Sequence, residues 1–390
     1  MKRFEAGKYL DLFRRELLER VIPFWLEHSL DRECGGYFTC LDRDGRVYDT
    51  TKFMWLQSRQ VWMLSRLYNS LDKNEVWLDA ARLGFEFIRK YGRDQSSGRV
   101  YFSLARDGRP LSIQRKIFAE VFYVMALNEY SRAAGDREIN KEAVEIFEKV
   151  IKWAADPAAL GRPLLEGQRP SSSLAVPMSI LWMAEQLGRG GDEKAFQPFI
   201  DNSIKGILLH LKSEKKIVLE NVAPDGSLLD GTNGRLINPG HAIEAGWFVL
   251  EEARKRGDRE VKEKALKMIE WSLEKGWDKE YGGIFYFLDA EDFPSPHLEW
   301  FMKLWWPHCE AAYATLLAFR ETGDKHFAAL FQKVADYAFS RFSDPLYGEW
   351  FGYLDRHGMP THTLKGGAYK GFFHVPRFLL LSIKLLEEIA

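Results

Sequence analysis

The chain has 390 residues, of which 46% are hydrophobic and 28% charged, a balance typical of a folded globular protein rather than a disordered one. Its 55 lysines and arginines nearly cancel its 56 aspartates and glutamates, so the net charge of −1 indicates no nucleic-acid or anionic-membrane partner. No apolar run approaches the roughly 20 residues that span a bilayer, and the charged N-terminal segment is unlike a secretory signal. We therefore expect a cytoplasmic protein.

The three cysteines, Cys34, Cys40 and Cys309, are too few for a disulfide scaffold. We expect them to be reduced, although Cys34 and Cys40 could pair if the turn between them allowed it.

Apolar residues recur at helical spacing along most of the chain, and no Gly/Ser-rich linker or charge block interrupts them. We therefore predict one domain, residues 1–390. The predicted helices span residues 8–28, 52–71, 74–92, 115–134, 139–154, 172–188, 193–212, 239–256, 259–276, 300–322, 325–342 and 373–388.

Four segments between these helices share one pattern, and they begin at Asp31, Asp94, Asp278 and Asp344. In each, Asp and Gly open a turn, aromatic residues alternate along a strand, and a second polar turn follows, which predicts a short β-hairpin. Residues 215–231 resemble the pattern loosely.

The four hairpins start 63, 184 and 66 residues apart, so a unit of about 61 residues would occur six times. Each unit would contain two helices and a hairpin. This repeat predicts an all-α (α/α)6 barrel, a toroid of about twelve helices with the hairpins at one end, although an open solenoid is an alternative. The long loops would wall a pocket at that end.

Several common catalytic motifs are absent from the sequence: a Walker A loop, a dinucleotide fingerprint, a nucleophile elbow and HExxH. The glycine-rich segment 365–371 lacks the strand and spacing of a phosphate loop. No cluster of His, Cys, Asp and Glu has convincing metal-ligand spacing, so we predict no metal.

Two histidines occupy unusual local settings. His241 follows Asn-Pro-Gly, a helix-start signal, and Glu244 lies on the same helix face, where it could orient the imidazole. His374 also lies at a predicted helix start, with Arg377 one turn later. Each histidine could instead be an ordinary core or capping residue.

The segment 299–310 is rich in tryptophan and contains Trp306 and Glu310, together with Lys303 and His308. A tryptophan beside a carboxylate suits a sugar, because the indole packs on the apolar face of the ring and the acid binds hydroxyls. An inner helix with ordinary core tryptophans is the alternative. Arg59 lies in an otherwise apolar helix, so it either has a buried partner or extends to the surface.

Several motifs resemble the N-acylglucosamine 2-epimerase family, and they keep the family order from about residue 8 to the C-terminus. They are FWLEHS (24–29), GGYFTCL (35–41), WLQSRQVW (55–62), NPGH (238–241), LEW (298–300), KLWWPH (303–308), GEWFGY (348–353) and FHVPR (373–377).

This resemblance implies an (α/α)6 barrel that forms a homodimer and interconverts N-acetyl-D-glucosamine and N-acetyl-D-mannosamine. It places the family's catalytic positions on Arg59, His241, Glu310, His374 and Arg377. It further implies substrate contacts from Arg59, Glu244 and Trp306. ATP would be an allosteric activator that is not consumed, bound near the loop that contains Arg162.

In the mechanism that we expect, the sugar ring opens, and the C1 aldehyde then acidifies the hydrogen on C2. His241 and His374 would act on opposite faces of C2 as base and acid, since imidazole serves both roles near neutral pH. Arg59 would stabilise the oxyanion at O1. Arg377 and Glu310 would fix sugar hydroxyls or neighbouring side chains.

Other functions fit the same sequence less well. The family also contains cellobiose 2-epimerases and aldose–ketose isomerases, but those isomerases tend to carry an extra histidine on the helix containing residues 174–178, where this chain has none. Glycoside hydrolysis could use Glu244 and Glu310 but would leave both histidines idle. A non-enzymatic binding protein would need an exposed apolar patch.

Overall fold

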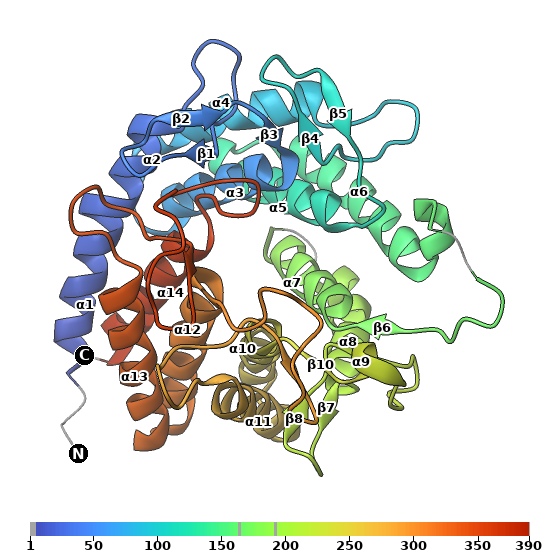
Figure 1. Ribbon diagram of the computed structural model, residues 1–390. Coiled ribbons are helices and arrows are strands. Elements are labelled where there is room, and N and C mark those ends of the chain that lie inside the picture. Colours follow the sequence, from blue (N-terminus) through green and yellow to red (C-terminus); the bar gives the residue numbers. More distant parts are fainter. Residues whose placement is uncertain (1–4, 163–164, 191–192, 390) are drawn as a thin grey trace.

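A computed structural model describes residues 5–162, 165–190 and 193–389, and its long helices form two concentric rings (Figure 1). The inner ring consists of α3 (Met54–Ser70), α5 (Phe118–Ala134), α7 (Ala175–Gly190), α10 (Pro239–Arg256), α12 (Trp305–Thr322) and α14 (His374–Ile389). The outer ring consists of α1 (Ala6–Arg15) with η1 (Glu16–Val21) and α2 (Ile22–His28), then α4 (Glu75–Tyr91), α6 (Arg137–Ala155), α8 (Glu193–Leu208), α11 (Arg259–Gly276) and α13 (Lys325–Arg341).

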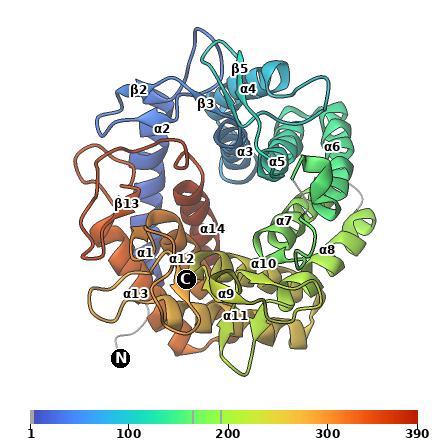
Figure 2. The same cartoon turned by 45° about the vertical axis from the view of Figure 1, so that its right-hand side comes forward.

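The inner ring is closed, as Figure 2 shows. Each inner helix packs against the next, and α14 contacts both α12 and α3, so the last unit of the chain meets the first. The predicted (α/α)6 barrel is therefore confirmed, and the open solenoid is excluded. Within the described residues, no helix has the length and apolar character needed to cross a membrane.

Burial explains why the two rings differ in sequence. α12 is buried from Trp305 to Ala318, and a helix that is apolar on all sides must be enclosed by others. α4 is amphipathic instead, with one buried face and one exposed face, and Asn74 caps its first turn by accepting a hydrogen bond from the backbone N–H of Val76. The outer helices therefore shield the inner ring from water.

The strands are short, and all of them lie in the connections, as do the short helices η2 (Pro157–Leu160) and α9 (Gly231–Gly234). They are β1 (Cys40–Leu41), β2 (Val47–Asp49), β3 (Lys52–Phe53), β4 (Ser103–Leu104), β5 (Pro110–Ser112), β6 (Ser172–Ser173), β7 (Leu211–Lys212), β8 (Ile217–Val218), β9 (Asn221–Val222), β10 (Leu236–Ile237), β11 (Leu288–Asp289), β12 (Lys303–Leu304) and β13 (Tyr353–Leu354).

The four repeated segments form the same turn. Antiparallel bridges close each of them, joining Leu30 to Tyr37, Arg93 to Val100, Trp277 to Ile284 and Ser343 to Trp350. Strands that immediately precede inner helices then pair with the next hairpin, as β3 does with β4 and β12 with β13. This pairing fixes the N-terminal ends of the inner helices.

Several helix predictions extend too far, including those that begin at residues 52 and 172, where β3 and β6 form instead, and two further cases show the reason. Residues 300–304 were expected at the start of a helix, but Lys303 and Leu304 form β12 and pair with β13, so α12 begins at Trp305. Residues 209–212 were expected in a helix that instead ends at Leu208, because Leu211 and Lys212 form β7. In both cases strand pairing overrides the helical periodicity of the sequence.

A buried ion pair anchors the first hairpin. Lys52 Nζ lies 2.9 Å from Asp31 Oδ2, and both side chains are fully buried. Arg106, from the following hairpin, donates two hydrogen bonds to the same carboxylate. Burial disfavours the charged carboxylate, but the hydrogen bonds from Arg106 and Lys52 outweigh it and lower the pKa of Asp31 to about 2.

The same trio recurs around the ring, each time linking one hairpin to the next. The equivalent residues are Asp278 with Lys303 and Arg356, and Asp344 with Lys365 and Arg43. The third trio joins the last hairpin to the first. The barrel end that carries the hairpins is therefore held together by ionic links as well as by strand pairing.

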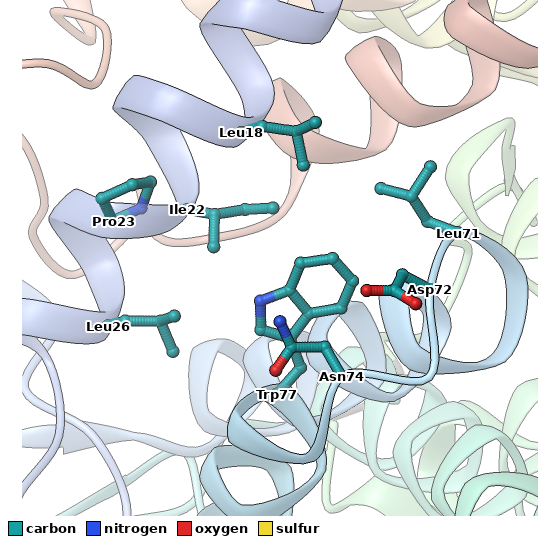
Figure 3. A pocket seen from close by; sticks show the side chains of 8 residues that line it. All are labelled: Leu18, Ile22, Pro23, Leu26, Leu71, Asp72, Asn74 and Trp77. Carbon is teal, nitrogen blue, oxygen red and sulfur yellow. The ribbon is translucent and has the colours of Figure 1, made fainter.

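A groove of about 600 Å³ lies on the outside of the barrel, between the first outer helix and the start of α4 (Figure 3). It is lined by Leu18, Ile22, Pro23, Leu26, Leu71, Asp72, Asn74 and Trp77. These residues come from η1, α2, α4 and the turn before α4, so the groove is separate from the inner ring.

Candidate active site

His241 lies in the first turn of α10, where the side chain of Asn238 caps the helix by accepting a hydrogen bond from the backbone N–H of His241. The Asn-Pro-Gly sequence therefore starts a helix as predicted. At Gly240 a Cβ atom would lie 2.5 Å from the indole of Trp306, so only glycine lets that indole approach the end of α10.

The hydrogen-bond partner of His241 is Glu220, which sequence reasoning missed. Its Oε2 lies 3.1 Å from Nδ1 of His241, and its Oε1 accepts a hydrogen bond from the hydroxyl of Ser173. Glu244 makes no such contact, because its carboxylate binds Arg377, so the prediction that Glu244 orients His241 is wrong. Periodicity could not find Glu220, since it lies in an irregular segment between two strands.

Glu220 determines the charge preference of His241. Burial disfavours the imidazolium, but the adjacent carboxylate of Glu220 favours it by charge and by hydrogen bonding. The net effect raises the pKa of His241 above its ordinary value. The side chain of His241 remains 29% exposed, so it is open to a ligand.

His374 is the first residue of α14, and its Nδ1 lies 2.8 Å from Oε1 of Glu310. A carboxylate only accepts hydrogen bonds, so Nδ1 carries the proton and Nε2 has a free lone pair. Burial, followed by the positive charges of Arg377 and Arg59, holds the pKa of His374 well below its ordinary value. The two histidines therefore have opposite protonation preferences.

A buried ion network lies beneath His374. Nη2 of Arg377 is 2.5 Å from Glu244 Oε1 and 2.7 Å from Glu310 Oε1, while the indole N–H of Trp247 donates to Glu310 Oε2 at 2.9 Å. Two carboxylates thus share one guanidinium. Glu244, Glu310 and His374 also present possible metal-ligand atoms within 4.8 Å of one another. Arg377 already supplies a cation to both carboxylates.

Arg59 lies in the same region but has a different environment. Its guanidinium packs over the rings of Trp55, Phe122 and Phe373, with the guanidinium carbon 4.0–4.8 Å from their centroids. Its Nε has no hydrogen-bond partner among the described residues. Burial lowers the pKa of Arg59 to about 9. This cation is therefore held by aromatic faces, and one of its buried donors lacks a partner among the described residues.

Trp306 joins the two histidines. Its ring centroid lies 5.3 Å from that of His241 and 5.8 Å from that of His374. Three inner helices, α10, α12 and α14, thus bring their first turns together around one indole. The site contains every residue that the resemblance marked as catalytic or substrate-binding.

Other candidate residues have structural roles. Lys303 is the buried partner of Asp278. His308 accepts a hydrogen bond from the backbone N–H of Ile284, and burial lowers its pKa to about 3. In the glycine-rich segment 365–371, Lys365 and Lys370 form buried ion pairs with Asp344 and Glu349.

The remaining sequence expectations concern Arg162 and the three cysteines. Arg162 is exposed, and its Nε donates to the backbone carbonyl of Arg115, while residues 163–164 beside it lie outside the described residues. Cys34, Cys40 and Cys309 are free thiols.

Comparisons with known proteins point to one family. The family profile described as N-acylglucosamine 2-epimerase matches residues 36–171 and 194–377. The N-acylglucosamine 2-epimerase of Mus musculus is 47% identical over 379 residues, covering 95% of this chain and 90% of the mouse protein. The Homo sapiens protein of the same name is 46% identical over 379 residues, covering 95% and 89%.

Solved structures support the fold. The cellobiose 2-epimerase from Spirochaeta thermophila superposes with a TM-score of 0.83 at 22% identity and covers 98% of both chains. From the profile match and the identity to the mouse and human proteins, the chain belongs to the N-acylglucosamine 2-epimerase family.

Proposed function

We propose that this protein interconverts N-acetyl-D-glucosamine and N-acetyl-D-mannosamine by inverting C2. The observation that supports this most directly is the placement of His241 and His374 against one indole, with pKa values displaced in opposite directions. The names of the mouse and human relatives support the same reaction.

The chemistry needs an acid and a base at one carbon. In the open-chain sugar, the C1 aldehyde acidifies the hydrogen on C2, and its removal leaves a planar enolate. Inversion requires that the new proton arrive on the opposite face. Two groups whose environments push their pKa values apart are suited to these roles, because at neutral pH one is a base and the other an acid.

The assignment of roles follows from the hydrogen bonds. His374 is neutral, and because its Nδ1–H donates a hydrogen bond to Glu310, the lone pair of Nε2 is free to remove the hydrogen from C2. His241, which Glu220 biases toward the protonated form, delivers a proton to the other face. The two histidines exchange roles in the reverse reaction, as microscopic reversibility requires.

Arg59 is the candidate for stabilising the enolate oxygen. It is a cation in an aromatic surrounding, where charge is weakly screened, and its Nε has no partner among the described residues. Arg377 is committed to Glu244 and Glu310 and therefore acts mainly by positioning Glu310 and His374. Trp306 would pack on the apolar face of the sugar, and Glu244 would contact a hydroxyl.

The family resemblance supports two further proposals. The protein forms a cytoplasmic homodimer, and ATP bound near Arg162 activates it without being consumed. We also propose that no metal or redox cofactor takes part.

The test is incubation of N-acetyl-D-mannosamine with the protein in D₂O, with analysis of the products by NMR. We expect N-acetyl-D-glucosamine with deuterium at C2. His241→Ala and His374→Ala should each lose epimerisation, and one of them should still exchange C2 hydrogen in a single isomer. His326→Ala, which removes a half-exposed histidine from α13, should behave like the wild type. A ketose product, or full activity in both active-site variants, would refute the proposal.

A further inference from the structure

A second cavity opens at the opposite end of the barrel from His241 and His374. It has a volume of about 340 Å³ and lies among the C-terminal halves of α3, α7, α10, α12 and α14. We call it the rear cavity, and its residues used below are Trp62, Arg66, Trp182, Glu185, Gln186, Arg189, Arg377 and Lys384.

The inner end of the rear cavity is polar but lacks partners. Among the described residues, four side chains that line it carry a buried nitrogen or oxygen without a hydrogen bond. These atoms are Trp62 Nε1, Glu185 Oε1, Gln186 Oε1 and Arg377 Nη1. Glu185 and Gln186 are only 4% and 3% exposed. Buried polar atoms normally have partners, so donors and acceptors that converge on one cavity indicate a polar occupant.

The outer end of the rear cavity is positively charged. Arg66 lies 3.6 Å from Glu129, but Glu129 also pairs with Arg132. Neither Arg189 nor Lys384 has a hydrogen bond or an ion pair within the part of the chain that the structure describes. Burial, and then the positive charges of Arg66 and Arg189, lower the pKa of Lys384.

Helix dipoles explain part of this pattern, because the negative ends of the inner helices favour cations here. A helix dipole is not a counterion, however, so Arg189 and Lys384 still lack a carboxylate partner within the described residues. Three of the described acids line the cavity, Glu185, Glu251 and Glu388. Glu251 is paired with Arg254 and Glu388 with Arg320, and burial raises the pKa of Glu185 well above its ordinary value, which favours its neutral form. A neutral carboxylic acid both donates and accepts hydrogen bonds.

We propose that the rear cavity is a second ligand site, which takes a hydroxylated organic anion. Arg66, Arg189 and Lys384 bind its phosphoryl or carboxylate group, and Glu185 and Gln186 bind its hydroxyls. Trp62 and Trp182 also line the cavity and supply apolar contact surface for the carbon skeleton. Arg377 belongs both to this cavity and to the network of Glu244 and Glu310, so an occupant would lie one side chain away from the catalytic groups.

The test is isothermal titration of the full-length protein with three related sugar ligands. The three share a six-carbon polyhydroxylated skeleton and differ in their acidic group: glucose 6-phosphate carries a phosphoryl group, gluconate carries a carboxylate, and glucose is neutral. We expect at least one of the two anions to bind at least tenfold more tightly than glucose, and the stronger of them identifies the acidic group that the site prefers.

Variants locate the binding. Arg189→Gln with Lys384→Met should weaken the anion at least tenfold, whereas Arg259→Gln, an exposed cation on the outer helix α11, should change the affinity less than twofold. Arg189 is exposed, so Arg189→Gln alone should fold normally and show a smaller loss. Binding of the anions no tighter than glucose, or unchanged in the double variant, would overturn the proposal. Because binding is measured rather than catalysis, the result does not depend on the proposed epimerase activity.

Discussion

Arg43 donates two hydrogen bonds to the carboxylate of Asp344, which lies 301 residues later in the chain. Lys365 approaches the same carboxylate to 2.9 Å, and the side chains of Lys365 and Asp344 are fully buried. The trio thus closes the ring of hairpins where the first unit meets the last. Burial disfavours the carboxylate, but the hydrogen bonds from Arg43 and Lys365 dominate and lower the pKa of Asp344.

We predict that Asp344→Asn lowers the free energy of unfolding by about 3–5 kcal/mol at pH 7, because Lys365 would remain buried without its countercharge. The pKa of Asp344 is depressed in the folded state, so its contribution is present above the unfolded value of about 3.9 and is lost as the pH falls. The difference in free energy of unfolding between Asp344→Asn and the wild type should therefore become smaller below about pH 4. Urea unfolding at several pH values measures both effects.

The control for this change is Asp42→Asn in the first hairpin, beside Arg43. Asp42 pairs with Arg46, which is largely exposed, so the expected loss is under about 1 kcal/mol. An equal decrease in the free energy of unfolding for the two variants would show that the buried trio does not stabilise the contact between the first and last hairpins.

The fold was largely predictable because its determinants are local and repeated. Helical periodicity and the recurring hairpins starting at Asp31, Asp94, Asp278 and Asp344 gave the two rings and the correct unit length. What the pattern could not show is that three of these aspartates bind a lysine and an arginine from other segments. Such pairs depend on which hairpins become neighbours, and only the closed ring determines that.

We predict that Glu220→Gln lowers the pKa of His241 and so shifts the alkaline limb of the pH profile of kcat/KM to lower pH by about 1 unit. The loss of a nearby carboxylate usually has at least that effect on an imidazole. His241 acts as a proton donor, and a lower pKa means that the donor is lost at a lower pH. We also expect kcat/KM at pH 7.5 to fall about 10- to 100-fold, as it does when a carboxylate that orients a metal-bound imidazole is removed.

Glu214→Gln provides the comparison, since Glu214 is exposed and lies near Glu220 in sequence without touching His241. Its pH profile should match that of the wild type. An unshifted alkaline limb in Glu220→Gln would show that Glu220 does not set the protonation of His241.

Most members of the candidate site could be named from the sequence, but Glu220 and the pairings of the side chains could not. His241, His374, Arg59, Glu310 and Arg377 were all marked by the family resemblance. Glu244 appeared to be the partner of His241 because i and i+3 residues share a helix face. In the folded protein Arg377 draws Glu244 away, and Glu220 reaches His241 from a loop. Pairing across the barrel thus overrides proximity along one helix.

We predict that Glu310→Gln lowers kcat/KM by more than about 10², the lower limit for loss of a positioned acid or base. Glu310 accepts hydrogen bonds from His374, Arg377 and Trp247, and a glutamine has one acceptor oxygen and an amide that only donates. The proton on His374 would lose its defined position. Trp247→Phe removes only one of these donors, so activity should stay within about threefold and stability should fall by about 1 kcal/mol. Similar activities for the two variants would contradict this account of Glu310.

Arg59 and Arg377 are both buried cations, but their partners differ. Arg59 packs against aromatic rings and has no bonded carboxylate among the described residues, whereas Arg377 binds two carboxylates. We predict that Arg59→Met leaves the free energy of unfolding unchanged or increases it, while kcat falls by about 10²–10³. The depressed pKa of Arg59, about 9, means that folding disfavours its charge throughout the neutral range.

Arg377→Met should instead lower the free energy of unfolding by about 3–5 kcal/mol, because Glu244 and Glu310 would be left buried without a countercharge. Urea unfolding and steady-state kinetics on both variants test this contrast. Destabilisation of Arg59→Met by as much as Arg377→Met would mean that Arg59 is a structural cation, and the oxyanion would then need another source of positive charge.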